Sequence, residues 1–234
     1  DIYFISLPSF MKIIFTHLSN LSYQISMITM QHFENRELEG SSKTYRLNLI
    51  NSVTGYKSAH LVGTISPSGN KNLAVFSSIV HLGSNPALVG FILRPTTVPR
   101  HTHANMKSTG IFTLNAITKH QIEDAHHTSA KYPEEVSEFD LTNLEPENKK
   151  NWKAPYVNGA PIQMGCRYVN EYPIHENDTL LVIGSIEHIY IQNELLCEDG
   201  WVQLDRGEIV SINGLDGYAL PSLLDRFEYA RPKK

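Results

Sequence analysis

The sequence predicts an all-β protein with mainly antiparallel strands. From residue 45 onward, short segments rich in Val, Ile, Phe and Tyr alternate with turn signals. Many short strands of this kind are typical of a barrel or sandwich, because closing a sheet removes its exposed edges. The composition agrees, since 41% hydrophobic and 19% charged residues are ordinary for a globular protein. A chain of 234 residues is also long enough to bury a substantial core.

The predicted strands share β-branched and aromatic residues bounded by Gly, Pro, Asn or Ser. They are residues 59–66, 72–80, 87–93, 110–117, 164–174, 179–192 and 208–214. Pro67 and Gly69 provide turn geometry for a hairpin between the first two. The sequence "SNP" at 84–86 marks the end of the second strand.

Two stretches interrupt the strands. Residues 117–132 contain no proline and place Ile122 and Ala125 at helical spacing, which predicts a helix. Residues 133–155 are first acidic, then basic, and low in apolar side chains, which indicates an excursion over the surface. The expected fold therefore contains one or two short helices.

The chain is expected to form one domain over residues 41–234, preceded by an N-terminal extension, 1–40, of unassigned origin. Its first thirty residues are apolar but lack a basic start and a small-residue cleavage site, and polar residues interrupt them, so neither a secretory signal nor a membrane span is predicted. A net charge of -4 argues against a nucleic-acid surface. Only two cysteines, Cys166 and Cys197, are present, and a cytoplasmic protein with partly or fully buried thiols is expected.

The segment "RPTTVPRHTHANMKS" at 94–108 allows two interpretations. In an extended chain His101 and His103 would point to the same side and could share a metal. A metal site needs further ligands, however, and the neighbouring His126 and His127 would point apart on a helix. No HExxH motif or cysteine pair is present, so a catalytic metal is the less favoured interpretation.

An anion site fits this segment better. Arg94 and Arg100 offer guanidinium groups suited to phosphate, and Thr96, Thr97 and Thr102 offer hydroxyl donors. The segment is expected to run as a loop into the strand at 110–117, which leaves backbone N–H groups free as well. The alternative is a set of exposed loop residues without a ligand.

Two serines interrupt the strongly apolar strand at 72–80. Ser77 and Ser78 would face opposite sides of a regular strand, and one would enter the core unpaired. That would cost about 1–3 kcal/mol, so the strand is expected to bend or bulge there and present hydroxyl and N–H groups to a polar ligand. Alternatively, the serines bond only to neighbouring backbone.

Taken together, several segments resemble the flavin reductase-like family of FMN-binding split barrels. They are "YRLNLINSVTGYKSAHLVGT", "NLAVFSSIVHLGSNPALVGFILRP", "RHTHANMKSTGIFTLNAI" and "INGLDGYALPSLLDRFEYARPK". The similarity extends from about Tyr45 to Pro232. No single piece is diagnostic, but the order of elements is specific. The resemblance implies a split β-barrel of Greek-key type.

The resemblance also implies an FMN cofactor, a homodimer with the flavin near the subunit interface, and hydride uptake from NADH or NADPH. By motif, the flavin ring and ribityl chain would lie along Asn72, Ser77, Ser78 and Ile79. The phosphate would be held by Arg94, Arg100, His101 and Thr102, with Asn105 closing the loop. A later segment that approaches the flavin would contribute Leu215, Asp216 and Tyr218.

Hydride transfer to a flavin is chemistry that the cofactor supplies, so few catalytic side chains are expected. His126 or His127 is a candidate to protonate a product or tune the reduced flavin. Tyr218 could cover the ring. The sequence thus predicts an NAD(P)H-dependent flavin reductase that binds neither nucleic acid nor membrane. The main alternative is an FMN-carrying electron-transfer or binding protein without nicotinamide turnover.

Overall fold

The computed structural model describes residues 29–149 and 151–233. The chain forms two compact units, Asp1–Arg46 and Leu47–Lys234, and each is considered by itself. The division expected at 40/41 stays a prediction, and most of the proposed N-terminal extension lies outside the described residues. Within residues 29–149 and 151–233, none of the helices has the length and apolar character needed to cross a bilayer.

The first unit contains helix α2 (Asn35–Gly40) and the start of helix α3 (Lys43–Val53). The β pattern expected from residue 45 is therefore wrong up to Val53. The side chains of Asn51 and Ser52 donate to carbonyl groups one turn earlier, as in a helix. No residue of α3 is buried, so core packing did not decide its conformation.

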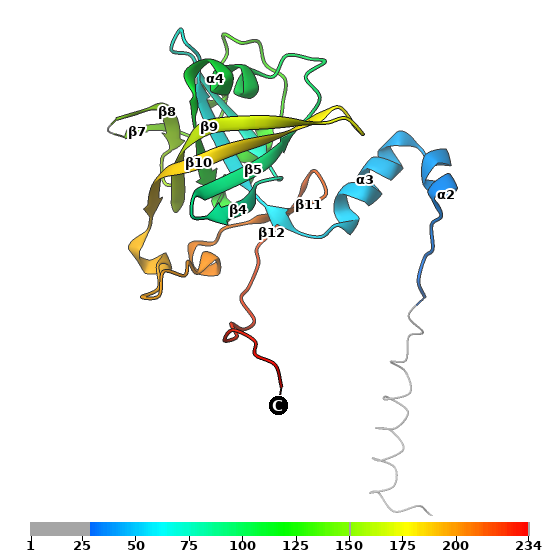
Figure 1. Cartoon of the computed structure of the whole chain (residues 1–234). Coiled ribbons are helices and arrows are strands. Elements are labelled where there is room, and N and C mark those ends of the chain that lie inside the picture. Colours follow the sequence, from blue (N-terminus) through cyan, green and yellow to red (C-terminus); the bar gives the residue numbers. More distant parts are fainter. Residues whose placement is uncertain (1–28, 150, 234) are drawn as a thin grey trace, which may run out of the picture. The chain divides into compact units, whose positions relative to one another are not determined.

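The second unit is built on a seven-stranded antiparallel sheet (Figure 1). Its strands are β2 (His60–Ile65), β3 (Lys71–Phe76), β4 (Val80–Ser84), β5 (Ala87–Leu93), β6 (Ile111–Ala116), β9 (Ile162–Ile174) and β10 (Thr179–Ile191). Their order in the sheet is β3-β2-β6-β9-β10-β5-β4, and every pairing is antiparallel. This confirms the prediction of a mainly antiparallel β protein.

The two edges of this sheet, β3 and β4, follow each other in the sequence but do not pair with each other. The ring of Phe76 at the end of β3 nevertheless packs against Phe91 of β5, with the ring centroids 5.4 Å apart. The sheet is thus curled enough to bring its two sides into contact through a shared core that also includes Phe112 and Val182. Closure into a full split barrel is treated below as a proposal.

Smaller elements surround the sheet. They are β1 (Lys57–Ser58), β7 (Pro146–Lys149), β8 (Trp152–Val157), β11 (Ser211–Asn213), β12 (Gly217–Ala219), α4 (His101–Thr109) and α5 (Ile122–His127). The helix predicted over 117–132 is present as the shorter α5, preceded by a 3₁₀ turn. The described part of the chain has four α-helices rather than one or two.

The interpretation of residues 133–155 as a surface excursion is partly wrong. Phe139 and Leu144 join the main apolar core, and Trp152 and Ala154 of β8 are buried. Strand β8 lies so close to the sheet that a side chain at Gly63 would collide with the backbone oxygen of Pro155. The stretch is polar on average because its apolar residues are few and widely spaced. Those few apolar residues nevertheless pack into the core.

Candidate functional site

Residues 101–109 form helix α4, not the loop that the sequence suggested. The buried positions of the helix are Thr102, Asn105 and Met106, which have helical spacing. Two of these three are polar, so the apolar stripe that usually reveals a helix is missing. The presence of a helix favours the anion interpretation. The first N–H groups of a helix have no acceptor within the helix, so they are free to bind an anion at its N-terminus.

Two polar contacts fix α4 on the sheet. The amide nitrogen of Asn72, on edge strand β3, donates to the hydroxyl of Thr102 at 3.0 Å. The amide nitrogen of Asn105 donates to the hydroxyl of Thr64 on β2 at 3.2 Å. The structure therefore brings the predicted residues Asn72 and Thr102 together. Asn105 lies one turn further along α4 and bonds to strand β2 instead.

The start of α4 has the features of an anion site. Its N-cap residue, Arg100, makes no side-chain capping bond, and the first turn contains no acidic residue. The guanidinium of Arg100 donates from Nε to the carbonyl of Pro95, the residue after Arg94, at 3.3 Å. Both arginines thus belong to one turn of chain beside an uncapped helix start, a setting that suits phosphate. Thr96 and Thr97 are exposed in the same turn.

The geometry assumed for a metal site is wrong. His101 and His103 lie on a helix, so they point in different directions. The Nε2 of His103 is 2.6 Å from Oε2 of Glu171 on β9, and the other carboxylate oxygen accepts from Lys107 at 2.9 Å. Across residues 29–149 and 151–233, no group of three or more His, Cys, Asp or Glu side chains could hold a metal ion.

A buried carboxylate that sequence reasoning missed lies at the same edge of the sheet. Glu138, in the 3₁₀ turn Glu138–Leu141, is 6% exposed, and its Oε2 accepts from the backbone N–H of Leu73 at 2.8 Å. Burial raises the pKa of this carboxyl, while the bond from Leu73 and the nearby charge of His101 act in the opposite direction. An isolated glutamate in an acidic stretch gives no signal of burial, although the adjacent Phe139 could have suggested it.

The segment around the two serines is irregular, as expected. Strand β3 ends at Phe76 and β4 begins at Val80. The hydroxyl of Ser78 both donates to the carbonyl of Ile92 and accepts from its N–H, each at 3.1 Å. The alternative of bonding to neighbouring backbone therefore describes Ser78, while Ser77 lies beside it, half-buried, in the connection.

A residue of the later predicted segment, Tyr218, contacts His126, one of the two candidate catalytic histidines. Tyr218, on β12, lies with its hydroxyl 3.3 Å from Nδ1 of His126 on α5. The two rings are edge to face, with centroids 5.8 Å apart. Burial raises the pKa of the Tyr218 hydroxyl, and the charge of Asp216 in the preceding turn adds to this. His127, in contrast, bonds to Tyr132.

Three predicted residues remain: Ile79, Leu215 and Asp216. Ile79 is partly buried against the core that contains Phe91, and its carbonyl accepts from the Ser58 hydroxyl at 2.9 Å. Leu215 and Asp216 form the turn between β11 and β12. The structure thus brings predicted residues together in two places, Asn72 with Thr102 at the start of α4 and His126 with Tyr218 between α5 and β12.

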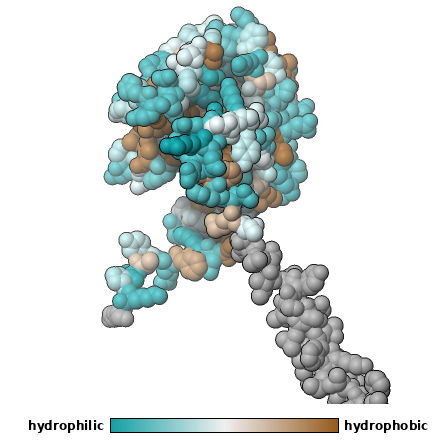
Figure 2. Space-filling model, turned by 90° about the vertical axis from the view of Figure 1, so that its right-hand side faces the viewer, coloured by the Kyte–Doolittle hydropathy of each residue, from teal (hydrophilic) through white to brown (hydrophobic). Residues whose placement is uncertain are grey.

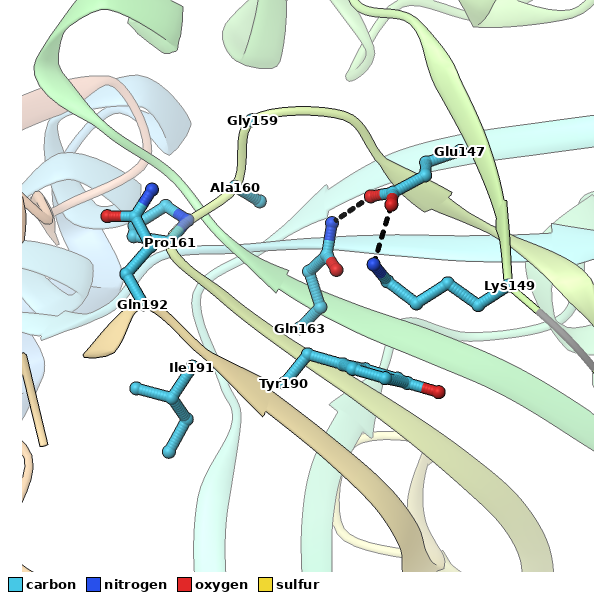
Figure 3. A pocket seen from close by; sticks show the side chains of 9 residues that line it. All are labelled: Glu147, Lys149, Gly159, Ala160, Pro161, Gln163, Tyr190, Ile191 and Gln192. Carbon is cyan, nitrogen blue, oxygen red and sulfur yellow. Dashed lines mark hydrogen bonds and ion pairs between the residues drawn. The ribbon is translucent and has the colours of Figure 1, made fainter.

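A pocket of about 220 Å³ lies elsewhere, beside β7, β9 and β10 (Figure 3). Inside it, Glu147 accepts from Lys149 at 2.6 Å and from Gln163 at 2.8 Å. The bond from Lys149 is the main reason that the pKa of Glu147 is lowered. None of the predicted flavin-binding residues lines this pocket.

The two cysteines differ in burial. Cys166 is fully buried, and burial raises the pKa of its thiol to about 12. Cys197 is half-buried and free. This agrees with the expectation of partly or fully buried thiols.

The chain is similar to several known structures. A protein from Shewanella frigidimarina NCIMB 400, provisionally named a flavin reductase with a split barrel domain, is 38% identical and superposes with a TM-score of 0.83 over 86% of this chain and 100% of its own. Nitrilotriacetate monooxygenase component B from Bacillus cereus shares the fold at 21% identity, with a TM-score of 0.73 over 86% and 99% of the two chains. An FMN-binding protein from Thermus thermophilus shares it at 16% identity, with a TM-score of 0.65 over 86% and 100%.

The sequence itself matches the model of a protein family. Residues 57–203, which include β1 to β10, match the flavin reductase-like domain. This stretch contains α4, the edge strand β3 and the connection with the two serines. The resemblance seen in the sequence is thereby confirmed: the chain belongs to the flavin reductase-like domain family.

Proposed function

We propose that this protein is an NAD(P)H-dependent oxidoreductase that binds FMN, and specifically a flavin reductase that transfers hydride from NADH or NADPH to flavin. The observation that carries the proposal is the uncapped start of α4 beside edge strand β3, joined by Asn72 and Thr102, in a member of the flavin reductase-like family. The FMN-binding protein from Thermus thermophilus, which has the same fold, supports FMN as the flavin.

In this proposal each group of predicted residues has a role. The N–H groups at the start of α4, with Arg94, Arg100, His101 and Thr102, hold the phosphate. Asn72, Ser77, Ser78 and Ile79 line the ribityl chain and the ring, with Asn105 supporting α4 from behind. Leu215, Asp216 and Tyr218 approach the ring from the other side.

Bound flavin supplies the hydride-accepting chemistry, and the chain supplies orientation and protons. We assign proton delivery to His126, because Tyr218 fixes its ring through Nδ1. His127 is the second candidate.

The visible spectrum of the purified protein tests the proposal. A yellow protein that NADH or NADPH bleaches without air, and that releases FMN, is the expected result. A yellow protein that neither nucleotide bleaches would instead support an FMN-carrying electron-transfer or binding protein. A colourless protein that takes up no flavin on reconstitution would contradict both.

A closed split barrel and a homodimer are parts of the same proposal. Because Phe91 and Val182 point into the core, the alternate residues of β4, β5 and β10 face outward. Val80, Leu82 and Ile92 are exposed there, next to Leu181. Figure 2 shows that hydrophobic residues form separate patches on a mainly hydrophilic surface. We infer that the outer face of β4 and β5 is covered by a second copy of the chain, since apolar patches of this kind are typical of interfaces.

A further inference from the structure

The buried Glu138 carboxylate has no role in the function proposed above, yet it lies beside the residues assigned to the phosphate. The N–H that it accepts belongs to Leu73, the residue after Asn72, and Asn72 bonds to Thr102. The charge of His101, the first residue of α4, is close enough to act on it. Glu138 is therefore an acidic residue beside Asn72, His101 and Thr102, which otherwise suit an anion.

The placement of Glu138 is set by the fold. Strand β3 is an edge of the main sheet, so the N–H of Leu73 points away from its neighbour β2. Glu138 satisfies this donor and holds the 3₁₀ turn against the strand. Of the other charged groups nearby, Asp140 is exposed on the same turn, and Lys71 begins β3 two residues before Leu73.

A neutral side chain could make the same bond to Leu73. The amide oxygen of a glutamine accepts a hydrogen bond as a carboxylate does. The negative charge therefore adds nothing that the backbone contact requires, and keeping it buried is costly. Near a phosphate, a charge of the same sign lowers the affinity for that phosphate.

We propose that Glu138 is a specificity-determining residue of the FMN site: its carboxylate opposes the phosphate and keeps bound FMN exchangeable. The inference rests on the proposed function, since it presumes that the phosphate lies at the start of α4. Exchangeable flavin suits a reductase that passes reduced flavin on to another protein. When the carboxyl is protonated, the opposition disappears.

The test compares Glu138→Gln with Glu135→Gln, a matched control at an exposed glutamate of the same segment. Dissociation constants of FMN and riboflavin are measured at pH 8, where an ordinary histidine is neutral. We expect Glu138→Gln to bind FMN about tenfold more tightly, the scale of repulsion between charges about 10 Å apart near a protein surface. Riboflavin binding should not change, and Glu135→Gln should match the wild type for both ligands.

A second variant, Glu138→Asp, keeps the negative charge and serves as the charge-preserving comparison. Its dissociation constants for FMN and riboflavin are measured in the same way. FMN should bind Glu138→Asp no more tightly than the wild type, because the charge that opposes the phosphate is kept.

The possible outcomes separate this inference from the proposed function. Unchanged or weaker FMN binding by Glu138→Gln, an equal change for riboflavin, or FMN binding by Glu138→Asp as tight as by Glu138→Gln would overturn the role of Glu138. If the wild type binds FMN no more tightly than riboflavin, the phosphate site itself is wrong. If it binds neither flavin, the proposed function fails.

Discussion

The amide nitrogen of Asn72 and the hydroxyl oxygen of Thr102 lie 3.0 Å apart, and both side chains are buried. This bond ties the edge strand β3 to the first turn of α4. Thr102→Val keeps the shape of the side chain but removes the acceptor, which leaves a buried amide unpaired. We expect a loss of about 1–3 kcal/mol in the free energy of unfolding, measured by urea denaturation. Thr97→Val, at an exposed position, is the control and should change it little.

The arginine at the start of α4 should distinguish FMN from riboflavin. Arg100→Ala removes a charge-assisted contact worth about 1.5–3 kcal/mol, so FMN affinity should fall roughly tenfold to a hundredfold while riboflavin affinity is kept. His101→Ala should matter less, because a neutral histidine donates one hydrogen bond. Fluorescence titration of both flavins measures this, with Arg231→Ala in the exposed tail as the control. Equal losses for both flavins would show that the phosphate binds elsewhere.

His126 should carry proton transfer in the proposed reaction. Loss of a general acid typically lowers a rate by at least about a hundredfold, so His126→Gln should do this to flavin reduction or turnover. Tyr218→Phe should have a smaller effect and shift the pH profile, since it removes only the 3.3 Å contact that orients the ring. His120→Gln is the control, because the His120 side chain is 76% exposed. An unchanged rate in His126→Gln would remove this histidine from the mechanism.

His60 should make the fold sensitive to acid. Burial lowers the pKa of its imidazole to about 4, and its Nδ1 has no hydrogen-bond partner in the described structure. The unfolded chain, with an ordinary histidine pKa of about 6.5, binds the proton first. Stability is therefore complete above about pH 6.5 and is lost as the pH falls toward 4, by up to about 3 kcal/mol.

The measurement for His60 is the melting temperature of the wild type and His60→Gln between pH 7.5 and pH 4.5. Because glutamine does not titrate, the gap between the two proteins should change in favour of the variant as the pH falls. His120→Gln should follow the wild type throughout. Parallel curves for wild type and His60→Gln would show that His60 is not the acid-sensitive group.

The outer face of β4 and β5 should control assembly. Leu82 is 44% exposed on edge strand β4, and a charge there would oppose a second copy of the chain. Leu82→Glu should convert the proposed dimer to a monomer in light scattering. Leu204→Glu, at a leucine that is 50% exposed outside this face, is the matched control and should leave the mass unchanged. A wild-type monomer that binds FMN tightly would contradict the dimer.

Local signals accounted for the parts of the fold that the sequence predicted well. Strand 87–93 was predicted at its observed bounds, because a turn ending in Pro86 and the pair Arg94–Pro95 limit it on both sides. Helix α4 was missed, since its buried Thr102 and Asn105 are satisfied by partners 30 and 41 residues away in the chain. Such partners leave no periodic pattern, and the sequence could not indicate that these polar positions face inward.

The same limit applies to the candidate site. The residue types in the segment 94–108 indicated an anion, and the structure adds the helix start that such a site uses. The contact between His126 and Tyr218 joins residues 92 positions apart, so only the fold could reveal it. Family resemblance selected Tyr218 and the chemistry of histidine selected His126, but neither indicated their hydrogen bond.

The bond between Leu73 and Glu138 also has a consequence for biosynthesis. Edge strand β3 leaves the ribosome 65 residues before the side chain that covers its N–H. During that interval the strand offers an open edge to other nascent chains, and open edges favour aggregation. The segment around Glu138 is therefore synthesised after strand β3 and then covers its open edge. Shortening this segment, or slowing its synthesis, should lower the yield of folded protein more than it lowers ligand affinity.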